Sequence, residues 1–378
     1  MATRHLIACF PVFCDGTWVS YTAVSLCEAM QAPDLQVALH VPAATGSGRR
    51  PFVRPVVPTW LIPIAYRIDP RERWIAPRLW RRVGAALRPG TPQHLYDHAR
   101  ARGATIVTER INSQLANVMR ILDAEFGRLG LPPTHGLTAE MHAAEVRELE
   151  SADYVFAPSP FVCDSLTAVG IPAAKVIPAS YGWDPRRIQP ETRRRGATAP
   201  TCVFVGTVCI RKGAHLLLQA WHGAQPKGAL WLCGTVRDEV RQVAGAWLQA
   251  PGVECLGHVD DIDRRLAQAD IMLFPTLEEG SPLVIYEAMA RGLAIVTTAV
   301  GAGAVLRDQI EGIVLDPHDQ DAWVAAIHRL CGDPDLRLQL GAAAQARARE
   351  FTWEQVGRRR REALLERLEA GRLPGAWN

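Results

Sequence analysis

The feature that most constrains this chain is a series of short, almost unbroken apolar runs that alternate with longer segments of helical character. Clear examples of these runs are residues 5–10, 35–41, 104–108, 154–158, 202–206, 229–233, 270–275 and 294–298. A strand that is apolar along its whole length must be covered on both faces, as in a parallel sheet between layers of helices. The alternation with helices therefore predicts βαβ units and an α/β fold.

A second feature divides the chain into two parts. Residues 184–200 read DPRRIQPETRRRGATAP and contain three prolines, five arginines and almost nothing apolar, which indicates a linker. We therefore predict two doubly wound, Rossmann-like domains that face each other across a cleft, with residues 1–184 before a linker at 185–200. In such folds a ligand binds beyond the carboxyl ends of the strands.

Composition excludes several classes of protein. The apolar content of 48% is too high for a disordered chain, and no apolar stretch reaches the ~18 residues of a membrane-spanning helix. Pro11 interrupts the apolar run 6–14, which favours a buried strand over a signal-peptide core. The nine scattered cysteines form no C-x-x-C pair, so we expect reduced thiols in a cytoplasmic protein and neither a zinc nor a redox site.

The most informative stretch is residues 276–292, TLEEGSPLVIYEAMARG, which directly follows an apolar run. Ser281 suits a helix N-cap, Pro282 the first helical position and Gly292 the stop, so the pattern predicts a helix over 282–291. The helix dipole and the first free amides would form an anion site close to the strand end. The residues of this site would be Leu283 and Val284, with Gly280 allowing a phosphate or sugar to approach the backbone.

Two carboxylates in this stretch have different surroundings. Glu279 lies in the loop before the helix, whereas Glu287 lies one and a half turns into it, beside apolar positions. A carboxylate at such a place must find donors or lose its charge. The vicinal hydroxyls of a ribose could supply them, but an ion pair with Arg291 at i,i+4 explains Glu287 equally well.

A basic turn lies earlier in the chain, directly after another predicted strand. Residues 204–213, FVGTVCIRKG, run from a predicted strand into a helix and place Arg211 and Lys212 at the same sheet edge as the acidic loop. The spacing differs from that of a P-loop. Two cations at this edge could compensate the charge that develops on a diphosphate leaving group. An ordinary solvated turn is the alternative interpretation.

These motifs together resemble a retaining glycosyltransferase of family 4 with the GT-B fold. The resemblance rests on E-x7-E at Glu279 and Glu287, on G-x4-R-K-G at Gly206–Gly213, and on residues 152–184, ADYVFAPSPFVCDSLTAVGIPAAKVIPASYGWD. It extends to Glu109, Arg110 and the segment after them. It implies an acceptor-side domain at 1–184, a nucleotide-sugar-binding domain at 201–350 and a last helix within 351–378 that packs back on the first domain.

The resemblance also implies roles for particular residues. Glu287 would hold the ribose hydroxyls and Glu279 would contact the donor sugar, while Arg211 and Lys212 would bind the diphosphate. No enzyme nucleophile, metal or other cofactor is then expected. Further donor contacts are expected from Gly206, Gly280, Ser281, Leu283, Val284 and, near the base, His258. The acceptor-side candidates are Asp15, Gly16, Arg110, Asn112 and Gln114.

The chain departs from the family pattern at several positions. Thr207 replaces the usual arginine after Gly206, and residues 13–18 hold one glycine where the family has two. Gln114 stands where one branch often has histidine, and a neutral amide cannot exchange protons. The competing hypotheses are a GT-B sugar-nucleotide epimerase, which the residue at 114 disfavours, and a non-catalytic sugar-nucleotide-binding protein. Asp261 and Asp263 match a D-x-D metal pattern, but a helix-capping role is the better interpretation.

The net charge of +3 hides a strongly basic segment. Residues 49–88 contain ten arginines and two acidic residues, which give a local charge of +8 and leave −5 for the rest of the chain. Aromatic residues are interleaved with the arginines, as suits an anionic membrane surface or a polyanionic acceptor. A solvated arginine face is the simpler alternative. No recognition motif for nucleic acid accompanies the charge, so the expected partners are a nucleotide-diphosphate sugar and a glycan or lipid-linked acceptor.

Overall fold

The computed structural model describes residues 4–9, 18–41, 50–55, 96–97, 100–101, 103–189 and 199–370. The predicted apolar runs each overlap a strand within these ranges. The strands are β1 (Arg4–Cys9), β2 (Leu35–Val41), β3 (Val53–Pro55), β4 (Val107–Glu109), β5 (Tyr154–Ala157), β6 (Val176–Pro178), β7 (Thr201–Val205), β8 (Ala229–Cys233), β9 (Val253–Gly257), β10 (Ile271–Phe274), β11 (Ala294–Thr297) and β12 (Ile313–Val314).

Helices connect the strands, as a parallel α/β arrangement requires. In the part of the chain before the predicted linker they are α1 (Trp18–Ala29), α5 (Leu115–Arg128), α6 (Ala139–Ser151), α7 (Pro160–Ala168) and the 3₁₀ turn Ala173–Lys175. After it they are α8 (Ala214–Ala224), α9 (Asp238–Leu248), α10 (Ile262–Gln268), α11 (Leu283–Ala290), α12 (Ala299–Ala302), α13 (Gln320–Gly332), α14 (Pro334–Ala348), the 3₁₀ turn Arg349–Phe351 and α15 (Trp353–Ala370).

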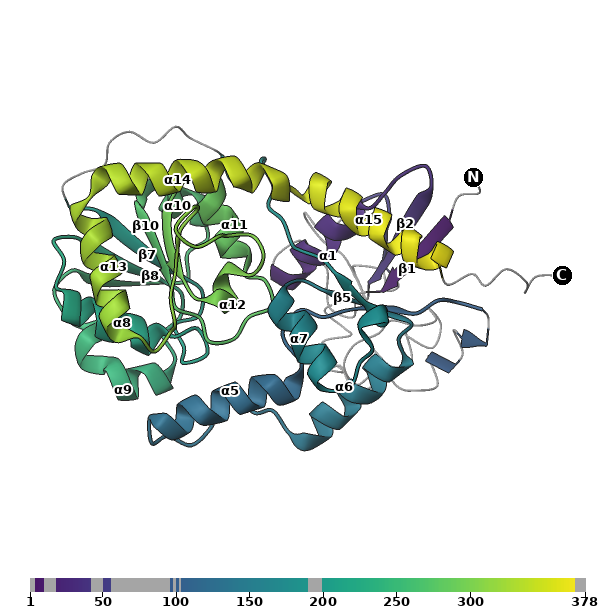
Figure 1. The fold of residues 1–378 in the computed structure, drawn as a ribbon, viewed down its shortest axis with the longest axis horizontal. Coiled ribbons are helices and arrows are strands. Elements are labelled where there is room, and N and C mark those ends of the chain that lie inside the picture. The colour runs from purple at the N-terminus through teal and green to yellow at the C-terminus, as the bar shows by residue number, and fades with distance from the viewer. Residues whose placement is uncertain are drawn as a thin grey trace.

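The C-terminal half is built on a parallel sheet with the strand order β12-β11-β10-β7-β8-β9. The chain order reverses between β7 and β10, which are hydrogen-bonded neighbours. Helices α8, α9 and α13 lie on one side of this sheet, and α10 and α11 lie on the side toward the N-terminal half (Figure 1). This is the doubly wound arrangement in which a ligand site forms at the point of reversal.

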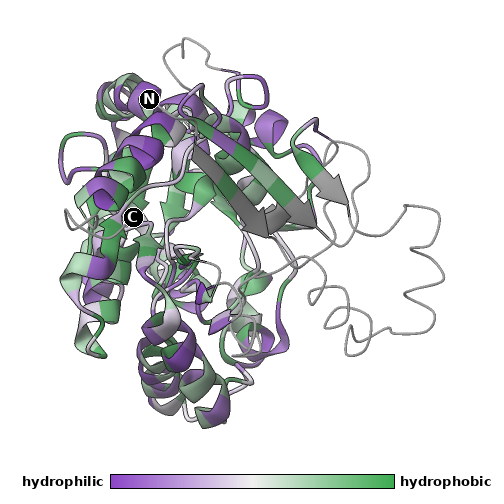
Figure 2. Cartoon of the chain, turned by 90° about the vertical axis from the view of Figure 1, so that its right-hand side faces the viewer, coloured by the Kyte–Doolittle hydropathy of each residue, from purple (hydrophilic) through white to green (hydrophobic). Residues whose placement is uncertain are grey.

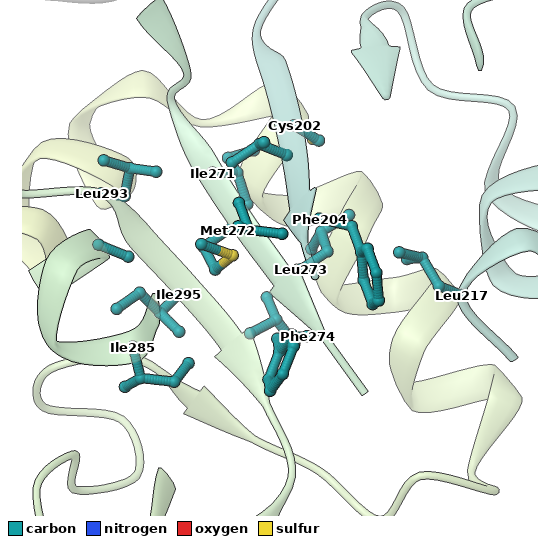
Figure 3. Close-up of a cluster of buried hydrophobic side chains, with 14 of the residues drawn as sticks. Cys202, Phe204, Leu217, Ile271, Met272, Leu273, Phe274, Ile285, Leu293 and Ile295 are labelled. Carbon is teal, nitrogen blue, oxygen red and sulfur yellow. The ribbon is translucent and has the colours of Figure 1, made fainter. Parts of the chain in front are cut away.

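The core of the C-terminal half explains why its strand sequences are unbroken apolar runs. Phe204 of β7 and Phe274 of β10 are completely buried, and their ring centroids lie 5.7 Å apart. Side chains from the sheet and from α8 and α11 surround them (Figure 3). Both faces of β10 are therefore covered, and a polar residue at any of its positions would be buried. The helices, in contrast, carry hydrophilic and hydrophobic residues in alternation (Figure 2).

The N-terminal half contains two parallel three-stranded sheets, β1-β2-β3 and β4-β5-β6. Leu35 of β2 and Phe156 of β5 belong to one hydrophobic cluster, so the two sheets share a core. The predicted α/β fold with parallel sheets is confirmed. Of the predicted linker, residues 190–198 lie outside the described part of the chain, as does most of the basic segment 49–88. Within the described residues, no helix is long and apolar enough to cross a membrane.

The last helix returns to the N-terminal half (Figure 1). Arg360 of α15 is buried, donates to both carboxylate oxygens of Glu109 at 2.7 and 3.1 Å, and lies over the ring of Phe156. At the start of the helix, Trp353 donates its indole N–H to the hydroxyl of Tyr21 at 2.8 Å. The C-terminal helix is thus anchored by a buried ion pair and by aromatic packing.

The chain crosses between the halves twice, and the two crossings are bonded together. The amide of Trp183 donates to the carbonyl of Phe351, and the amide of Trp353 donates to the carbonyl of Trp183, both at 3.0 Å. The indole N–H of Trp183 donates to the carbonyl of Ala348 at 2.7 Å. We refer to residues 181–184 and 348–353 as the hinge side of the contact between the halves.

Candidate active site

The candidate site lies where the loops after β7 and β10 meet. Because these two parallel strands are neighbours, the turn at 206–213 and the loop at 275–282 emerge at the same edge of the sheet. The amide of Leu277 donates to the carbonyl of Arg211 at 3.0 Å. Gly213 has φ +67°, and a methyl group there would lie 1.9 Å from the carbonyl oxygen of Pro275. The two loops therefore form one unit at the point where the strand order reverses.

The predicted basic and acidic residues are in direct contact in this unit. Lys212 forms an ion pair with Glu279, and Nη1 of Arg211 lies 3.1 Å from Oε1 of the same carboxylate. Burial alone would raise the pKa of Glu279, but Lys212 and Arg211 outweigh it and hold that pKa below its usual value. Burial would likewise lower the pKa of Arg211, whereas the neighbouring carboxylates Glu279 and Glu278 raise it. Glu279 and Arg211 are therefore both charged at neutral pH.

Gly206 lies beneath the side chain of Lys212. A methyl group at Gly206 would approach the aliphatic carbons of Lys212 to 3.2 Å, so the absence of a side chain there leaves room for the lysine to fold back. The ammonium nitrogen of Lys212 lies 5.1 Å from the centroid of the Phe274 ring. The cation is thus held between a glycine, an aromatic ring and Glu279, at the edge of the sheet.

The start of α11 differs from the prediction in its cap. The helix begins at Leu283 with Pro282 as the N-cap, and the hydroxyl of Ser281 is hydrogen-bonded to that of Tyr286 at 2.6 Å. The predicted N-cap role of Ser281 is therefore wrong, because a buried tyrosine hydroxyl competes for the serine. Within the described chain no backbone acceptor is found for the amides of Leu283 and Val284. Gly292, with φ +69°, ends the helix as predicted.

Glu287 does not form the expected ion pair with Arg291. Arg291 is instead bonded to Asp263, with Nε donating to Oδ1 at 2.7 Å. Glu287 is partly buried, and its carboxylate makes no hydrogen bond or ion pair within the described ranges, although its main-chain carbonyl accepts from the amide of Arg291 at 3.0 Å. Burial raises its pKa to about 7, opposed by Arg187 and reinforced by Asp263. Of the two interpretations of Glu287, the structure contradicts the ion pair.

Asp261 and Asp263 both have structural partners. Asp261 is the N-cap of α10 and accepts from the amide of Arg264 at 3.1 Å, while Asp263 pairs with Arg291. Among the residues that the structure describes, no group of three His, Cys, Asp or Glu side chains could hold a metal ion. His258 is exposed and its Nε2 lies 3.4 Å from Asp260.

Gly280 faces the N-terminal half of the chain. A methyl group on Gly280 would lie 1.6 Å from the carbonyl oxygen of Ile111 and 3.2 Å from Cα of Asn112. The space expected for a phosphate or sugar at Gly280 is therefore occupied by the loop that follows β4. Gly280 is thus a point of close approach between two backbone segments of the chain, and the approach of a phosphate or sugar to it stays a prediction.

The acceptor-side candidates divide into two groups. Arg110 is buried and ion-paired with Glu145, and the side-chain oxygen of Gln114 caps α5 by accepting from the amide of Ala116 at 2.8 Å. The side-chain amide of Asn112, in contrast, donates to Glu278 in the loop at 275–282. Asp15 and Gly16 lie outside the described residues. Arg110 and Gln114 thus support the local fold of the loop, while Asn112 extends to the other half.

Sequence reasoning missed two residues that join the halves near this site. Glu278 is completely buried next to Glu279, and Glu125 of α5 contacts Nε2 of His215 on α8 at 2.6 Å. Burial alone would raise the pKa of Glu125, but His215 and Arg128 lower it to about 2. A second carboxylate directly after a buried strand was the only available signal for Glu278. Nothing in the sequence pairs Glu125 with His215.

Comparison with known proteins agrees with this geometry. Residues 199–333 match the family described as "Glycosyl transferases group 1". The chain is 32% identical over 169 residues to D-inositol 3-phosphate glycosyltransferase of Xylanimonas cellulosilytica, covering 42% of this chain and 40% of that protein. It is 31% identical over 147 residues to the lipopolysaccharide core biosynthesis glycosyltransferase LpsE of Rhizobium meliloti. This match covers 38% of this chain and 43% of LpsE. The matched stretches thus span about two-fifths of these relatives.

Solved structures with the same fold cover nearly the whole chain. Anabaena HepE, in complex with UDP and glucose, aligns with a TM-score of 0.65 at 15% identity over 96% of this chain and 99% of its own. Sucrose-phosphate synthase from Thermosynechococcus elongatus aligns with a TM-score of 0.65 at 19% identity, over 98% and 100%. The resemblance inferred from the motifs is supported: residues 199–333 match the model of the group 1 glycosyltransferases, and the chain has the GT-B fold of these solved structures.

Proposed function

We propose that this protein transfers a sugar from a nucleotide-diphosphate sugar to a glycan or lipid-linked acceptor with retention of anomeric configuration. The observation that carries the proposal is the meeting of Arg211, Lys212 and Glu279 where the strand order reverses, together with a Glu287 carboxylate on the helix that follows, which has no hydrogen-bond or ion-pair partner among the described residues. This arrangement offers cations for a diphosphate, a carboxylate for a sugar and an acceptor for ribose hydroxyls. Neither of the competing hypotheses, an epimerase or a non-catalytic binding protein, gains a specific observation.

In this mechanism the bond between the anomeric carbon and the diphosphate oxygen breaks, and its electron pair remains on the diphosphate. Arg211 and Lys212 stabilise that developing charge. The acceptor hydroxyl attacks the same face of the sugar, and its proton passes to the departing phosphate oxygen. No protein nucleophile is required. Because two side-chain cations supply the positive charge, we propose that the reaction needs no metal.

Glu279 and the diphosphate would share the same cations. In the structure Lys212 is paired with Glu279, so a bound diphosphate would draw the ammonium group toward itself. The released carboxylate would then accept hydrogen bonds from the sugar hydroxyls. Two negatively charged groups can occupy this position because Arg211 and Lys212 together carry two positive charges. Substitution of Arg211 or Lys212 should therefore reduce the stabilisation of the diphosphate leaving group and also disturb the position of the sugar.

Glu287 is proposed to accept hydrogen bonds from the ribose. Burial without a donor raises its pKa to about 7, which means that its charged form lacks compensation. Two vicinal hydroxyls would supply that compensation and lower the pKa on binding. Ribose recognition thus explains a group that has no structural partner in the described chain.

Binding of sugar nucleotides by thermal shift and calorimetry tests the proposal directly. UDP-glucose is the first donor to examine, because the HepE structure is a complex with UDP and glucose, followed by GDP and ADP sugars. A ligand should raise the unfolding midpoint through linkage, and Lys212→Ala should weaken that response. Lys227→Ala, which removes an exposed lysine beyond the far end of α8, is the matched control. Failure of every sugar nucleotide to bind would overturn the proposed function.

We propose that the N-terminal half lies against an anionic membrane surface and meets the acceptor there. The support is the basic, aromatic-rich segment 49–88, which would suit a peripheral position at the inner face of the membrane. The cysteines of the described chain are free thiols, in keeping with a cytoplasmic protein. Charge reversal at Arg78, Arg81 and Arg82 should abolish sedimentation with anionic liposomes. Unchanged sedimentation would contradict membrane contact.

A further inference from the structure

The loop after β4 touches the acidic loop after β10 through one buried carboxylate. Oε1 of Glu278 accepts from both the amide and the hydroxyl of Ser113 at 3.1 Å, and Oε2 accepts from the side-chain amide of Asn112 at 2.8 Å. Ser113 and Glu278 are 165 positions apart in the chain, so these bonds join the two halves. Gly280 allows the approach, since a side chain there would collide with Ile111.

The same carboxylate also holds a residue of the candidate active site. Nη1 of Arg211 donates to the main-chain carbonyl of Glu278 at 2.8 Å and lies 3.2 Å from its Oε2. Glu278 is completely buried, and a buried carboxylate must have its oxygens satisfied by donors. Here three donors come from the N-terminal half and one comes from Arg211. Contact between the halves and the position of Arg211 therefore depend on the same side chain.

We propose that Glu278 is a positioning residue that fixes Arg211 for transfer when the two halves are docked. The inference rests on the proposed function, because it assigns a step in sugar transfer to the contact. When Asn112 and Ser113 donate to both oxygens of the Glu278 carboxylate, that side chain is held in one position. The Arg211 guanidinium that is bonded to it is then held as well. A guanidinium held in place stabilises developing charge on the diphosphate better than one that must be reoriented.

This role separates binding from turnover. Lys212 and the amides at the start of α11 do not depend on Glu278, so the ground state of the nucleotide keeps most of its contacts. The rate of transfer depends on the exact placement of Arg211 in the transition state. Loss of the contact should therefore lower kcat while the affinity for UDP changes little.

Asn112→Asp is the direct test, because it places a second carboxylate where the amide now donates to Glu278. We expect faster hydrogen exchange in peptides that contain Ser113, about tenfold or more lower kcat, and a dissociation constant for UDP within about threefold of the original. Ala124→Asp, which adds the same charge on an exposed position of α5, is the control and should match the parent protein.

The reciprocal exchange distinguishes positioning from a purely structural contact. In the double variant Asn112→Asp/Glu278→Gln, the amide and the carboxylate exchange places, so the hydrogen bond can form again with its direction reversed. We expect recovery of the slow exchange at Ser113 but not of kcat, because the amide nitrogen introduced at position 278 would then face Nη1 of Arg211 and could not accept from it. Unchanged kcat in Asn112→Asp, or full recovery of kcat in the double variant, would overturn the positioning role.

The two proposals fail in different ways. Hydrogen exchange at Ser113 reports on the contact without any donor, and calorimetry with UDP reports on the donor site without the contact. A parent protein that binds no sugar nucleotide would overturn the proposed function and this inference with it. A parent protein that binds UDP and transfers sugar, but whose kcat is insensitive to Asn112→Asp, would overturn the inference alone.

Discussion

Two contacts between the halves of this molecule differ in chemistry. On the hinge side, backbone bonds join Trp183 to residues 351–353, and aromatic rings and the Arg360–Glu109 pair pack around them. We refer to residues 111–113 and 278–280 as the cleft side: there the carboxylate of Glu278 accepts from Asn112 and Ser113, and that of Glu279 pairs with Arg211 and Lys212, cations that a ligand could also use. The hinge side is built to remain closed, whereas the cleft side is built from polar bonds that can be replaced.

The difference teaches that stability and activity should respond to different residues. Groups on the hinge side are enclosed by aromatic side chains, so removal of one leaves another buried and unpaired. Groups on the cleft side are charged and border the candidate active site, so their removal should act on binding and turnover. The following predictions test that separation, from the largest expected effect to the smallest.

Arg360→Ala should produce the largest effect, and it should be an effect on stability. Removing Arg360 leaves the partly exposed Glu109 carboxylate uncompensated, so the cost should lie toward the lower end of the roughly 3–5 kcal/mol expected for a fully buried pair. Urea unfolding measures the change, with Arg358→Ala on the exposed side of the same helix as control. A loss below about 1 kcal/mol would show that the hinge side is not the rigid contact described above.

Arg211→Ala should reduce transfer with little effect on folding. Loss of one donor to developing charge typically lowers kcat by a hundredfold to a thousandfold, or about 2.7–4 kcal/mol. Steady-state kinetics with the identified donor measures the change, and circular dichroism checks the fold. Retention of more than about a tenth of kcat would place the diphosphate elsewhere.

Glu287→Gln should change the pH dependence of both donor binding and stability. The ionised carboxylate accepts from ribose hydroxyls, so binding by the parent protein should strengthen about tenfold as the pH rises from about 6 to about 8. Stability should fall as the pH rises between the ordinary carboxyl pKa and about 7, because the unfolded chain loses that proton first. The glutamine variant should show a flat binding profile and a smaller fall in stability.

Substitution of Glu148 distinguishes the pH dependence of stability from the pH dependence of donor binding. Burial raises its pKa to about 7, opposed by Arg110 and Thr108, so it lowers stability over the same pH range. It lies inside the N-terminal half, away from the proposed ribose site. Glu148→Gln should therefore alter the pH dependence of stability but leave that of donor binding unchanged. An equal effect of both variants on binding would contradict the ribose assignment.

Ser113→Ala should have the smallest effect. The substitution removes the hydroxyl bond to Glu278 but leaves the amide bond from the same residue to the same oxygen. The expected loss is about 1 kcal/mol, seen as roughly fivefold lower kcat. Enzyme kinetics beside Thr167→Ala, an exposed hydroxyl on α7, would measure it. A loss as large as that of Asn112→Asp would show that the hydroxyl, and not the arrangement of charge, controls the contact.

The sequence allowed the strands and the main site loops to be predicted because their signals are local. An unbroken apolar run indicates a strand covered on both faces, and β7 and β10 are such strands. The short strands β3, β6, β9 and β12 were missed because each is two to five residues long and lies at a sheet edge or beside one, where burial is incomplete. Their sequences therefore lack a continuous apolar signal.

The candidate site was predictable within each loop but not between loops. Glycine at 280, a glutamate pair and two adjacent cations are visible in the sequence, whereas the partners of these residues are set by the fold. The sequence predicts Ser281 as a helix cap, but its hydroxyl is hydrogen-bonded to that of Tyr286. Likewise, the spacing of Arg291 predicts an ion pair with Glu287, but Arg291 pairs with Asp263. Long-range polar contacts of this kind carry no periodicity, so a single sequence cannot indicate them.

The return of α15 has a consequence for the order in which the protein forms during synthesis. Residues 199–351 supply a complete sheet and its covering helices before α15 is made, so the C-terminal half can fold as soon as it leaves the ribosome. The N-terminal half must wait, because Leu364 of α15 belongs to the same cluster as Leu35 of β2. Although it is synthesised first, the N-terminal half should be the last to mature. Until then the part of its apolar core that α15 covers remains exposed.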